Sequence, residues 1–410
     1  MIPSNRTLPP PQILHAMLRK ITERFARELA SAAPLAPEWT DFEWTLARAV
    51  AAMHGVSPVL SQVLRWEGPL GWRQFIEAQR AHTLKRHARI AGLLRLLDEQ
   101  MRGASIAGLA LKGAALHAMG LYIPGDRPMA DIDLLVRPAD APRTVRLLES
   151  MRFRQSDQTW KETLFTPVDD HRHGELGENL GNDLKIELHE RICERLPWRI
   201  TDASDFIFPQ RPHPGLNAYP SKASLMIHLL LHAAGSMTTR ALRLLHLQDL
   251  ARLSSLMSEG DWDEVLAHCS RGRRLWWAFP PLMLLSVYYP AVIPGRVLAT
   301  LAGDCPYFLK RVARQRTLHD YSCSYLWVEA LPGIEWAQSV AEMLEYTASR
   351  VRPDASHTAR RRHIARTTTS ADHGPWARLS QGRRILRWIA SRQARPVTMH
   401  SVHAALSQSQ

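Results

Sequence analysis

The sequence predicts an α/β core embedded in N-terminal and C-terminal helical regions. Apolar residues recur with helical spacing up to residue 101 and again from residue 223 onward. Between these regions, short apolar runs are bounded by turn residues or alternate with polar residues, which is typical of strands. The expected divisions are a helical region over residues 1–100, the core over 101–200, a second helical region over 201–349 and a basic tail over 350–410.

The expected elements follow in order along the chain. In the N-terminal region, helices are predicted over residues 13–33, 43–53 and 73–101, after a disordered start. Gly55 can end the second of these helices, and Ser57-Pro58 can begin a further one. In the core, strands are predicted over residues 105–111, 131–136, 159–168 and 183–189, with helices beginning near residues 114 and 138. Later helices are predicted over residues 225–234, 241–256 and 264–270.

The composition is that of a globular protein. Of the 410 residues, 45% are hydrophobic and 22% are charged. The four cysteines lie far apart and form no Cys-x-x-Cys pair, so neither a zinc knuckle nor a thioredoxin-like motif is indicated. The N-terminal residues lack the apolar segment of a signal peptide. We therefore expect a cytoplasmic protein with reduced thiols.

The most apolar run covers residues 275–293, and its length approaches that of a membrane span. Pro280, Pro281 and Pro290 interrupt it, and prolines break the helix that a membrane span needs. A buried core segment is therefore favoured over a transmembrane segment.

Two aspartates mark the strand predicted over residues 131–136. Asp131 and Asp133 flank Ile132, so on a strand both carboxylates point to one face while Ile132 and Leu134 point to the other. Two adjacent carboxylates repel each other unless a cation lies between them. Mg²⁺, or Mn²⁺ in its place, is the expected cation, because it binds carboxylates together with substrate phosphates.

A candidate phosphate-binding turn precedes this strand. The apolar strand over residues 105–111 ends at Lys112-Gly113, and a helix follows. A strand–glycine–helix junction directs free backbone N–H groups at an anion. Lys112 either reaches a phosphate or is exposed at the strand end, and Arg127 pairs either with a phosphate or with Asp131, since arginine suits bidentate phosphate contacts.

The residues that carry a wider resemblance are Leu111-Lys112-Gly113, Arg127 and the sequence Asp-Ile-Asp-Leu-Leu-Val over 131–136. In these the chain resembles a group of largely uncharacterised bacterial nucleotidyltransferases, from the superfamily of beta-type DNA polymerases and antibiotic nucleotidyltransferases. Similar stretches cover residues 54–60, His228, His232 and residues 243–249, so the likeness spans roughly residues 40–255. It implies an α/β (α+β) nucleotidyltransferase core with a small mixed sheet.

The resemblance also implies a third acidic residue on a neighbouring strand, and Glu187 is the one that fits. In residues 183–189, Glu187 shares its predicted face with Lys185 and His189, while leucine and isoleucine occupy the other face. The chain departs from the pattern in two ways. Ala114-Ala115 stands where the superfamily usually has a glycine or serine, and Glu187 stands where this group more often has aspartate.

The activity that the resemblance implies is metal-dependent nucleotidyl transfer. Asp131, Asp133 and Glu187 would bind the metal ions, while Lys112, Gly113 and Arg127 would bind the nucleotide. An NMP group would pass from an NTP, expected to be ATP, to an acceptor hydroxyl or phosphate that the residues do not identify, and pyrophosphate would leave. The alternative is a non-catalytic nucleotide- or RNA-binding protein with the same fold.

Several histidines allow other interpretations. His171 and His173 lie beside two aspartates, but their polar loop favours solvent-exposed residues over a metal cluster. His228 and His232 have the i, i+4 spacing of zinc ligands, yet no glutamate follows His228 as in a His-Glu-x-x-His motif. Core or substrate-facing histidines are favoured there. His189 is expected near the nucleotide.

The tail from residue 350 onward holds twelve arginines and no lysine, opposed only by Asp354 and Asp372. It carries most of the chain's net charge of +13. Binding of nucleic acid or acidic lipid and a solvated, disordered state both remain open for it. One short basic amphipathic helix is expected around residues 385–389.

Overall fold

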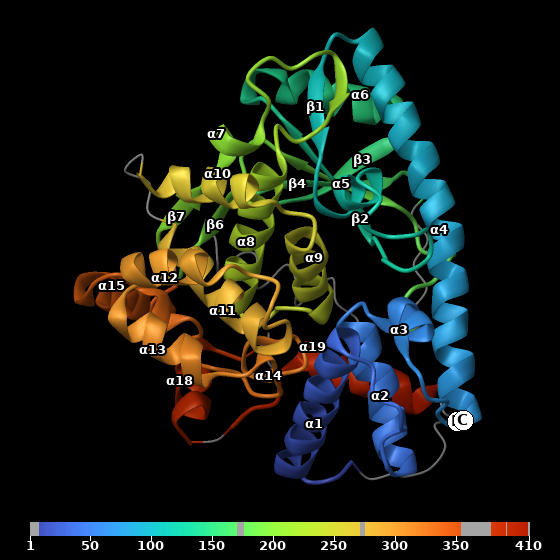
Figure 1. Cartoon of the computed structure of the whole chain (residues 1–410), viewed down its shortest axis with the longest axis vertical. Helices are drawn as coiled ribbons and strands as arrows, with labels where there is room; N and C mark the ends of the chain where they lie inside the picture. The colour runs from blue at the N-terminus through green and yellow to red at the C-terminus, as the bar shows by residue number, and fades with distance from the viewer. Residues whose placement is uncertain (1–7, 170–175, 271–274, 354–378, 391, 409–410) are drawn as a thin grey trace.

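The computed structural model describes residues 8–169, 176–270, 275–353, 379–390 and 392–408. A six-stranded mixed sheet lies in the upper part of the molecule, and helices flank it and fill the lower part (Figure 1), so the predicted α/β core within helical regions is confirmed. The strands are β1 (Ala107–Ala110), β2 (Asp131–Val136), β3 (Phe153–Gln158), β4 (Thr163–Pro167), β5 (Lys185–His189), β6 (Cys193–Arg195), β7 (Ile200–Asp202) and β8 (Gly215–Asn217).

The helices of the first half are α1 (Pro11–Ala30), α2 (Asp41–Met53), α3 (Ser57–Val63), α4 (Leu70–Gly103), α5 (Lys112–Ala118), α6 (Ala141–Ser150) and α7 (Ser204–Ile207). Those of the second half are α8 (Lys222–Thr238), α9 (Leu244–Ser254), α10 (Glu259–Ser270), α11 (Phe279–Tyr288), α12 (Gly295–Asp304), α13 (Tyr307–Gln315), α14 (Leu318–Tyr321), α15 (Val340–Val351), α18 (Gln381–Ala390) and α19 (Pro396–Ser407). The basic amphipathic helix expected near the C-terminus is α18.

The main sheet has six strands in the order β3-β4-β5-β2-β1-β8. Strand β2 pairs antiparallel with β1 and parallel with β5, so the sheet is mixed, as the resemblance implied. Strand β8 pairs parallel with β1, although it lies beyond the expected core boundary at residue 200. The core therefore extends to about residue 217 because its last strand returns to the sheet after β6 and β7.

The alternation of side chains along β2 divides two buried cores. Ile132, Leu134 and Val136 pack in one apolar cluster with residues of α4 and α6. Leu135, on the opposite face, belongs to a second and larger cluster formed by the helical regions, including α8. Both aspartates share the face of Leu135, because residues two apart on a strand point the same way. The sheet thus presents its acidic residues to the helices on that face.

Helix α4 runs along one side of the molecule, from the N-terminal helices to the sheet (Figure 1). Its buried residues Ile90, Leu97 and Met101 pack under the sheet, and Trp72 and Ile76 pack in the other cluster with the N-terminal helices. The predicted long amphipathic helix over residues 73–101 is confirmed. One helix therefore spans both cores.

Strand β3 was not predicted. Of its residues only Phe153 is buried, and the remaining side chains are exposed. An edge strand of this kind is held by its backbone pairing with β4, so it carries no apolar alternation for a sequence pattern to detect. The same reason applies to the three-residue strands β6, β7 and β8.

The C-terminal helix α19 is ordered, although it lies in the basic tail over residues 350–410, for which a disordered state was left open. Val402 is fully buried in the larger core cluster, and the Thr398 hydroxyl donates to the carbonyl of Cys323 at 3.1 Å. Arg395 donates to the carbonyl of Arg240 at 2.7 Å. Figure 1 shows α19 beside the N-terminal helices. This part of the tail belongs to the folded body.

The apolar run over residues 275–293 forms a 3-10 turn and α11. Leu275, Trp277, Phe279 and Leu282 are buried in the larger cluster, which confirms the predicted core segment. In the described part of the chain, no helix combines the length and the apolar character that a membrane crossing needs.

Candidate functional site

The strand register brings the three predicted acidic residues together. In the parallel pair of β2 and β5, Asp133 lies directly opposite Glu187, and Asp131 lies opposite Lys185. Asp131, Asp133 and Glu187 all line one cavity of about 330 Å³. Residues more than fifty positions apart in the sequence therefore lie side by side at one cavity.

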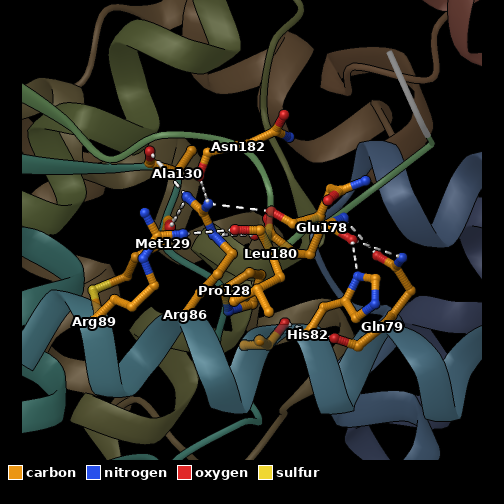
Figure 2. Close-up of polar contacts among 12 residues, drawn as sticks. Gln79, His82, Arg86, Arg89, Pro128, Met129, Ala130, Glu178, Leu180 and Asn182 are labelled. Carbon is orange, nitrogen blue, oxygen red and sulfur yellow. Dashed lines mark hydrogen bonds and ion pairs between the residues drawn. The ribbon is translucent and has the colours of Figure 1, made fainter. Parts of the chain in front are cut away.

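The long helix α4 holds the starts of both strands. Arg86, which is 3% exposed, donates to the carbonyl of Asn182 at 2.5 Å, just before β5. Its other terminal nitrogen lies 3.4 Å from the carbonyl of Met129, just before β2. Figure 2 shows Arg86 between these two segments, and Arg89 donates to the carbonyl of Leu180. A single buried guanidinium thus ties together the approaches to both acidic strands.

Glu178 extends this contact. Its carboxylate lies 3.2 Å from Arg86 Nε, and its backbone is held by Gln79 and His82 of α4 (Figure 2). Burial, opposed by the Arg86 charge, raises the pKa of Glu178. His171 and His173, which were weighed as a metal cluster, lie outside the described residues.

Lys112 and Gly113 form the first turn of α5. Lys112 has a left-handed backbone with φ of 47°, a conformation that costs free energy in residues other than glycine and often occurs at functional sites. Its Nζ donates to Asp133 Oδ1 at 2.6 Å, so it is neither exposed nor free. A Cβ at Gly113 would collide with Arg127 and Met129. Glycine is therefore required there for packing, apart from any role at a phosphate.

The pKa values of Asp131, Asp133 and Glu187 are shifted in different directions. Burial would raise the pKa of Asp133, but the Lys112 charge and the hydrogen bond from His189 hold it well below its usual range. Burial, and then the charges of Asp131 and Asp133, raise the pKa of Glu187 to about 8. Burial and the Asp133 charge also raise the pKa of Asp131. The single positive charge of Lys112 cannot neutralise three carboxylates, so the site favours the binding of additional positive charge.

His189 adds a nitrogen donor to the acidic pair. Asp133, Glu187 and His189 each offer an atom that could bind a metal, and these atoms lie within 4.8 Å of one another. His189 Nε2 lies 3.1 Å from Asp133 Oδ1 and 3.8 Å from Glu187 Oε2, and the side chain is 1% exposed. Its Nδ1 has no hydrogen-bond partner within the described residues and lies 4.0 Å from Glu162. The donor set therefore fits a divalent cation.

Arg127 lies in the cavity wall but pairs with Asp249 of α9, and not with Asp131. Arg127 Nε and Nη2 donate to the two carboxylate oxygens at 2.8 and 2.7 Å, and the Tyr122 hydroxyl donates to the same carboxylate at 2.8 Å. Both members of the pair are buried. The Asp249 charge raises the pKa of Arg127 although burial lowers it. This ion pair joins the core to the second helical region.

The remaining wall of the cavity comes from α8 and α9. His232 and His246 line it with their rings 4.7 Å apart, and burial lowers the pKa of each well below its usual value. His228 is buried, and its Nδ1 lies 2.7 Å from the Tyr219 hydroxyl. His228 is thus a core histidine and His232 faces the cavity, and their i, i+4 spacing does not form a zinc site among the described residues.

Sequence reasoning did not assign roles to Arg86, Asp249, His246 or Arg243, all of which stand at this site. Asp249, His246 and Arg243 lie in the stretch 243–249 that carried part of the resemblance. Their position in the cavity follows from the packing of α9 against α8 and from the contacts of Asp249 with the segment before β2, which no local pattern encodes. The shared face of His189 and Glu187 was the signal for His189.

A mixed sheet with paired aspartates and a neighbouring glutamate at one cavity defines a nucleotidyltransferase-like core. The chain belongs to a family of uncharacterised nucleotidyltransferases, whose model matches residues 40–287, more than half of its length. No curated protein and no solved structure matches the chain. Membership indicates nucleotidyl transfer and a nucleotide substrate at the level of the family.

Proposed function

We propose that the protein transfers a nucleoside monophosphate group from an NTP, expected to be ATP, to an acceptor hydroxyl or phosphate in a metal-dependent reaction. The observation that carries this proposal is the convergence of Asp131, Asp133 and Glu187 on one cavity. Three buried carboxylates so close together are unfavourable without cations, so their approach supports a metal site.

Asp131, Asp133 and Glu187 would hold Mg²⁺ or Mn²⁺, and His189 stands beside them as a further donor. When bound, the cations would supply positive charge at the triphosphate and lower the pKa of the acceptor oxygen. The acceptor oxygen forms a bond to the α-phosphorus, the bond from that phosphorus to the bridging oxygen breaks, and pyrophosphate leaves. The acceptor proton passes to a carboxylate of the cluster.

The chain's other residues would orient the substrates. Lys112 lies against Asp133, so it must exchange part of that contact before it can reach a phosphate. Gly113 and Ala114 line the same wall of the cavity, at the start of α5. His232 and His246 offer neutral nitrogens to the acceptor on the opposite wall.

The test is pyrophosphate release, measured with each of the four NTPs, Mg²⁺ or Mn²⁺ and a panel of candidate acceptors. We expect metal-dependent release that the Asp133→Asn variant lacks. Nucleotide binding without release under any of these conditions would favour the non-catalytic binding protein instead.

A further inference from the structure

Three cationic side chains line the cavity, and their situations differ. Lys112 donates to Asp133, and Arg127 is bound by both oxygens of Asp249. Arg243 forms no ion pair with any carboxylate among the residues that the structure describes, although it lines the same cavity and its side chain is exposed. It is close enough to affect the ionisation of Asp131 and Glu178.

A triphosphate in this cavity brings about four negative charges next to carboxylates that already repel one another. Metal ions at Asp131, Asp133 and Glu187 would neutralise part of that charge, and a positively charged side chain on the opposite wall is needed for the rest. Arg243 is available for this purpose without breaking an existing ion pair. Guanidinium groups bind phosphates through two parallel hydrogen bonds, which fixes orientation as well as charge.

The backbone just after Arg243 is anchored to the N-terminal helical region. The backbone N–H of Leu244 donates to His54 Nδ1 at 2.9 Å, and the N–H of Leu245 donates to the His54 carbonyl at 3.2 Å. His54 is fully buried, and burial lowers its pKa to about 3, so the ring is neutral. Since Nδ1 accepts a hydrogen bond, the ring proton is on Nε2, which faces Ser324 Oγ at 3.1 Å.

The turn at Gly55 keeps this anchor close to α9. Gly55 has a φ of +67°, and a Cβ there would come within 3.2 Å of the Leu245 side chain. Ser324 Oγ is in turn 2.7 Å from Thr22 Oγ1 of α1. The imidazole therefore connects the first turn of α9, directly after Arg243, with a buried polar network.

We propose that Arg243 binds the triphosphate of the NTP substrate and that His54 is a positioning residue that acts through the first turn of α9. This inference rests on the proposed function for the identity of the ligand. It assigns the phosphate contact to the helical wall of the cavity, in addition to the Lys112-Gly113 turn.

The direct test is the affinity for α,β-methylene-ATP with Mg²⁺, measured by isothermal titration calorimetry on the full chain. Arg243→Gln should weaken binding by about 10- to 100-fold, the loss typical of a charged hydrogen-bonded contact. Arg243→Lys should weaken it less, because it keeps the charge and loses the paired geometry. Arg146→Gln is the matched control, since Arg146 is exposed on α6 away from the cavity.

Melting temperature and Mn²⁺ binding distinguish a failure of the Arg243 inference from a failure of the proposed function. Arg243→Gln should keep the wild-type melting temperature and Mn²⁺ binding, because the acidic cluster is untouched. Wild-type affinity in Arg243→Gln would overturn this inference and leave the proposed function standing. Absence of nucleotide binding by the wild-type protein would overturn both.

The role of His54 is tested by a double-mutant cycle. His54→Gln places its amide near Nε2 and loses the acceptor at Nδ1, so affinity should fall by about 3- to 10-fold. His54→Asn keeps an acceptor near Nδ1 and should restore binding. Ser324→Ala removes the hydroxyl that holds the ring and gives a milder variant with the same expected direction.

In the Arg243→Gln background, neither His54→Gln nor Ser324→Ala should weaken binding further if they act through Arg243. Full additivity would show that His54 affects the site by another route and would overturn its positioning role. Because Ser324→Ala retains the imidazole of His54, the cycle can be completed with this variant even if His54→Gln does not fold.

Discussion

Both walls of the cavity contain buried carboxylates, but these carboxylates are neutralised to different extents. On the helical wall, one carboxylate, Asp249, receives three hydrogen bonds from Arg127 and Tyr122. On the sheet wall, Asp131, Asp133 and Glu187 share one nearby ammonium group, that of Lys112. The helical carboxylate is fully neutralised, whereas the sheet carboxylates are in excess.

This difference in neutralisation indicates which charged residues stabilise the fold and which bind a ligand. A buried ion pair with all its hydrogen bonds made needs nothing from outside the chain, and breaking it is strongly destabilising. Clustered carboxylates that raise one another's pKa stay unfavourable until a cation binds. Mutations of the Arg127–Asp249 pair should therefore act on folding, and mutations of the acidic residues on the sheet wall should act on chemistry and metal binding.

The largest effect is expected at Glu187. Glu187→Gln keeps the shape and removes the charge, so pyrophosphate release should fall by about 10³-fold, as loss of several kcal/mol of metal-assisted stabilisation implies. Nucleotide affinity should largely survive, because Asp131 and Asp133 remain. Glu187→Asp should retain more activity. The matched control is Glu190→Gln, which removes an exposed carboxylate three positions later, and normal turnover in Glu187→Gln would remove this residue from the site.

The ion pair on the other wall should affect folding most. Arg127→Met leaves Asp249 buried without its partner, so the free energy of unfolding should fall by about 3–5 kcal/mol in urea titrations. Adding Asp249→Leu should recover much of that loss, because an apolar pair replaces the unpaired charge. If Arg127→Met instead kept full stability and lost nucleotide affinity, Arg127 would belong to the ligand and the contrast between the walls would fail.

The acidic cluster also predicts how stability depends on pH in the metal-free protein. The pKa of Glu187 is raised from its ordinary value of 4.5 to about 8, so the folded protein binds an extra proton between these values. Its contribution to stability is fully present below pH 4.5 and is lost progressively as the pH rises from there to about 8. We expect a loss of about 1–3 kcal/mol.

Melting in EDTA between pH 7 and 9 measures the last part of this loss, about 1 kcal/mol, which should level off above pH 8. Ordinary histidines titrate near 6.5 and contribute little in that window. Glu187→Gln should flatten the profile, and excess Mg²⁺ or Mn²⁺ should reduce its slope. A profile that is equally steep in Glu187→Gln would assign the pH dependence to other groups.

The smallest effect is expected far from both walls, in α19. Val402 is fully buried, so Val402→Ala should lower the free energy of unfolding by about 1–2 kcal/mol without changing nucleotide affinity. Val397→Ala on the same helix is the control, because its side chain is 53% exposed and its removal should cost little. Equal stability of both variants would show that α19 does not contribute to the folded body.

Local chemistry in the sequence determined the acidic strand and its surroundings. Period-two alternation placed Asp131 and Asp133 on one face and Ile132 and Leu134 on the other, and burial follows that division. The same alternation placed Glu187 with His189. The long amphipathic helix α4 followed from its apolar spacing. These features depend on neighbours within a few residues, so a single sequence contains them.

Only the tertiary structure decided which distant residues complete the site. Arg127 was expected at a phosphate or at Asp131, but the docking of α9 gives it Asp249, a carboxylate 122 positions later. Likewise, the edge strand β3 and the packing of α19 depend on partners elsewhere in the chain. Strand β3 carries little apolar pattern, and α19, which itself contains no lysine or arginine, follows an arginine-rich segment. Pairing between remote segments is set by the packing of whole helices and strands, and that information is not local.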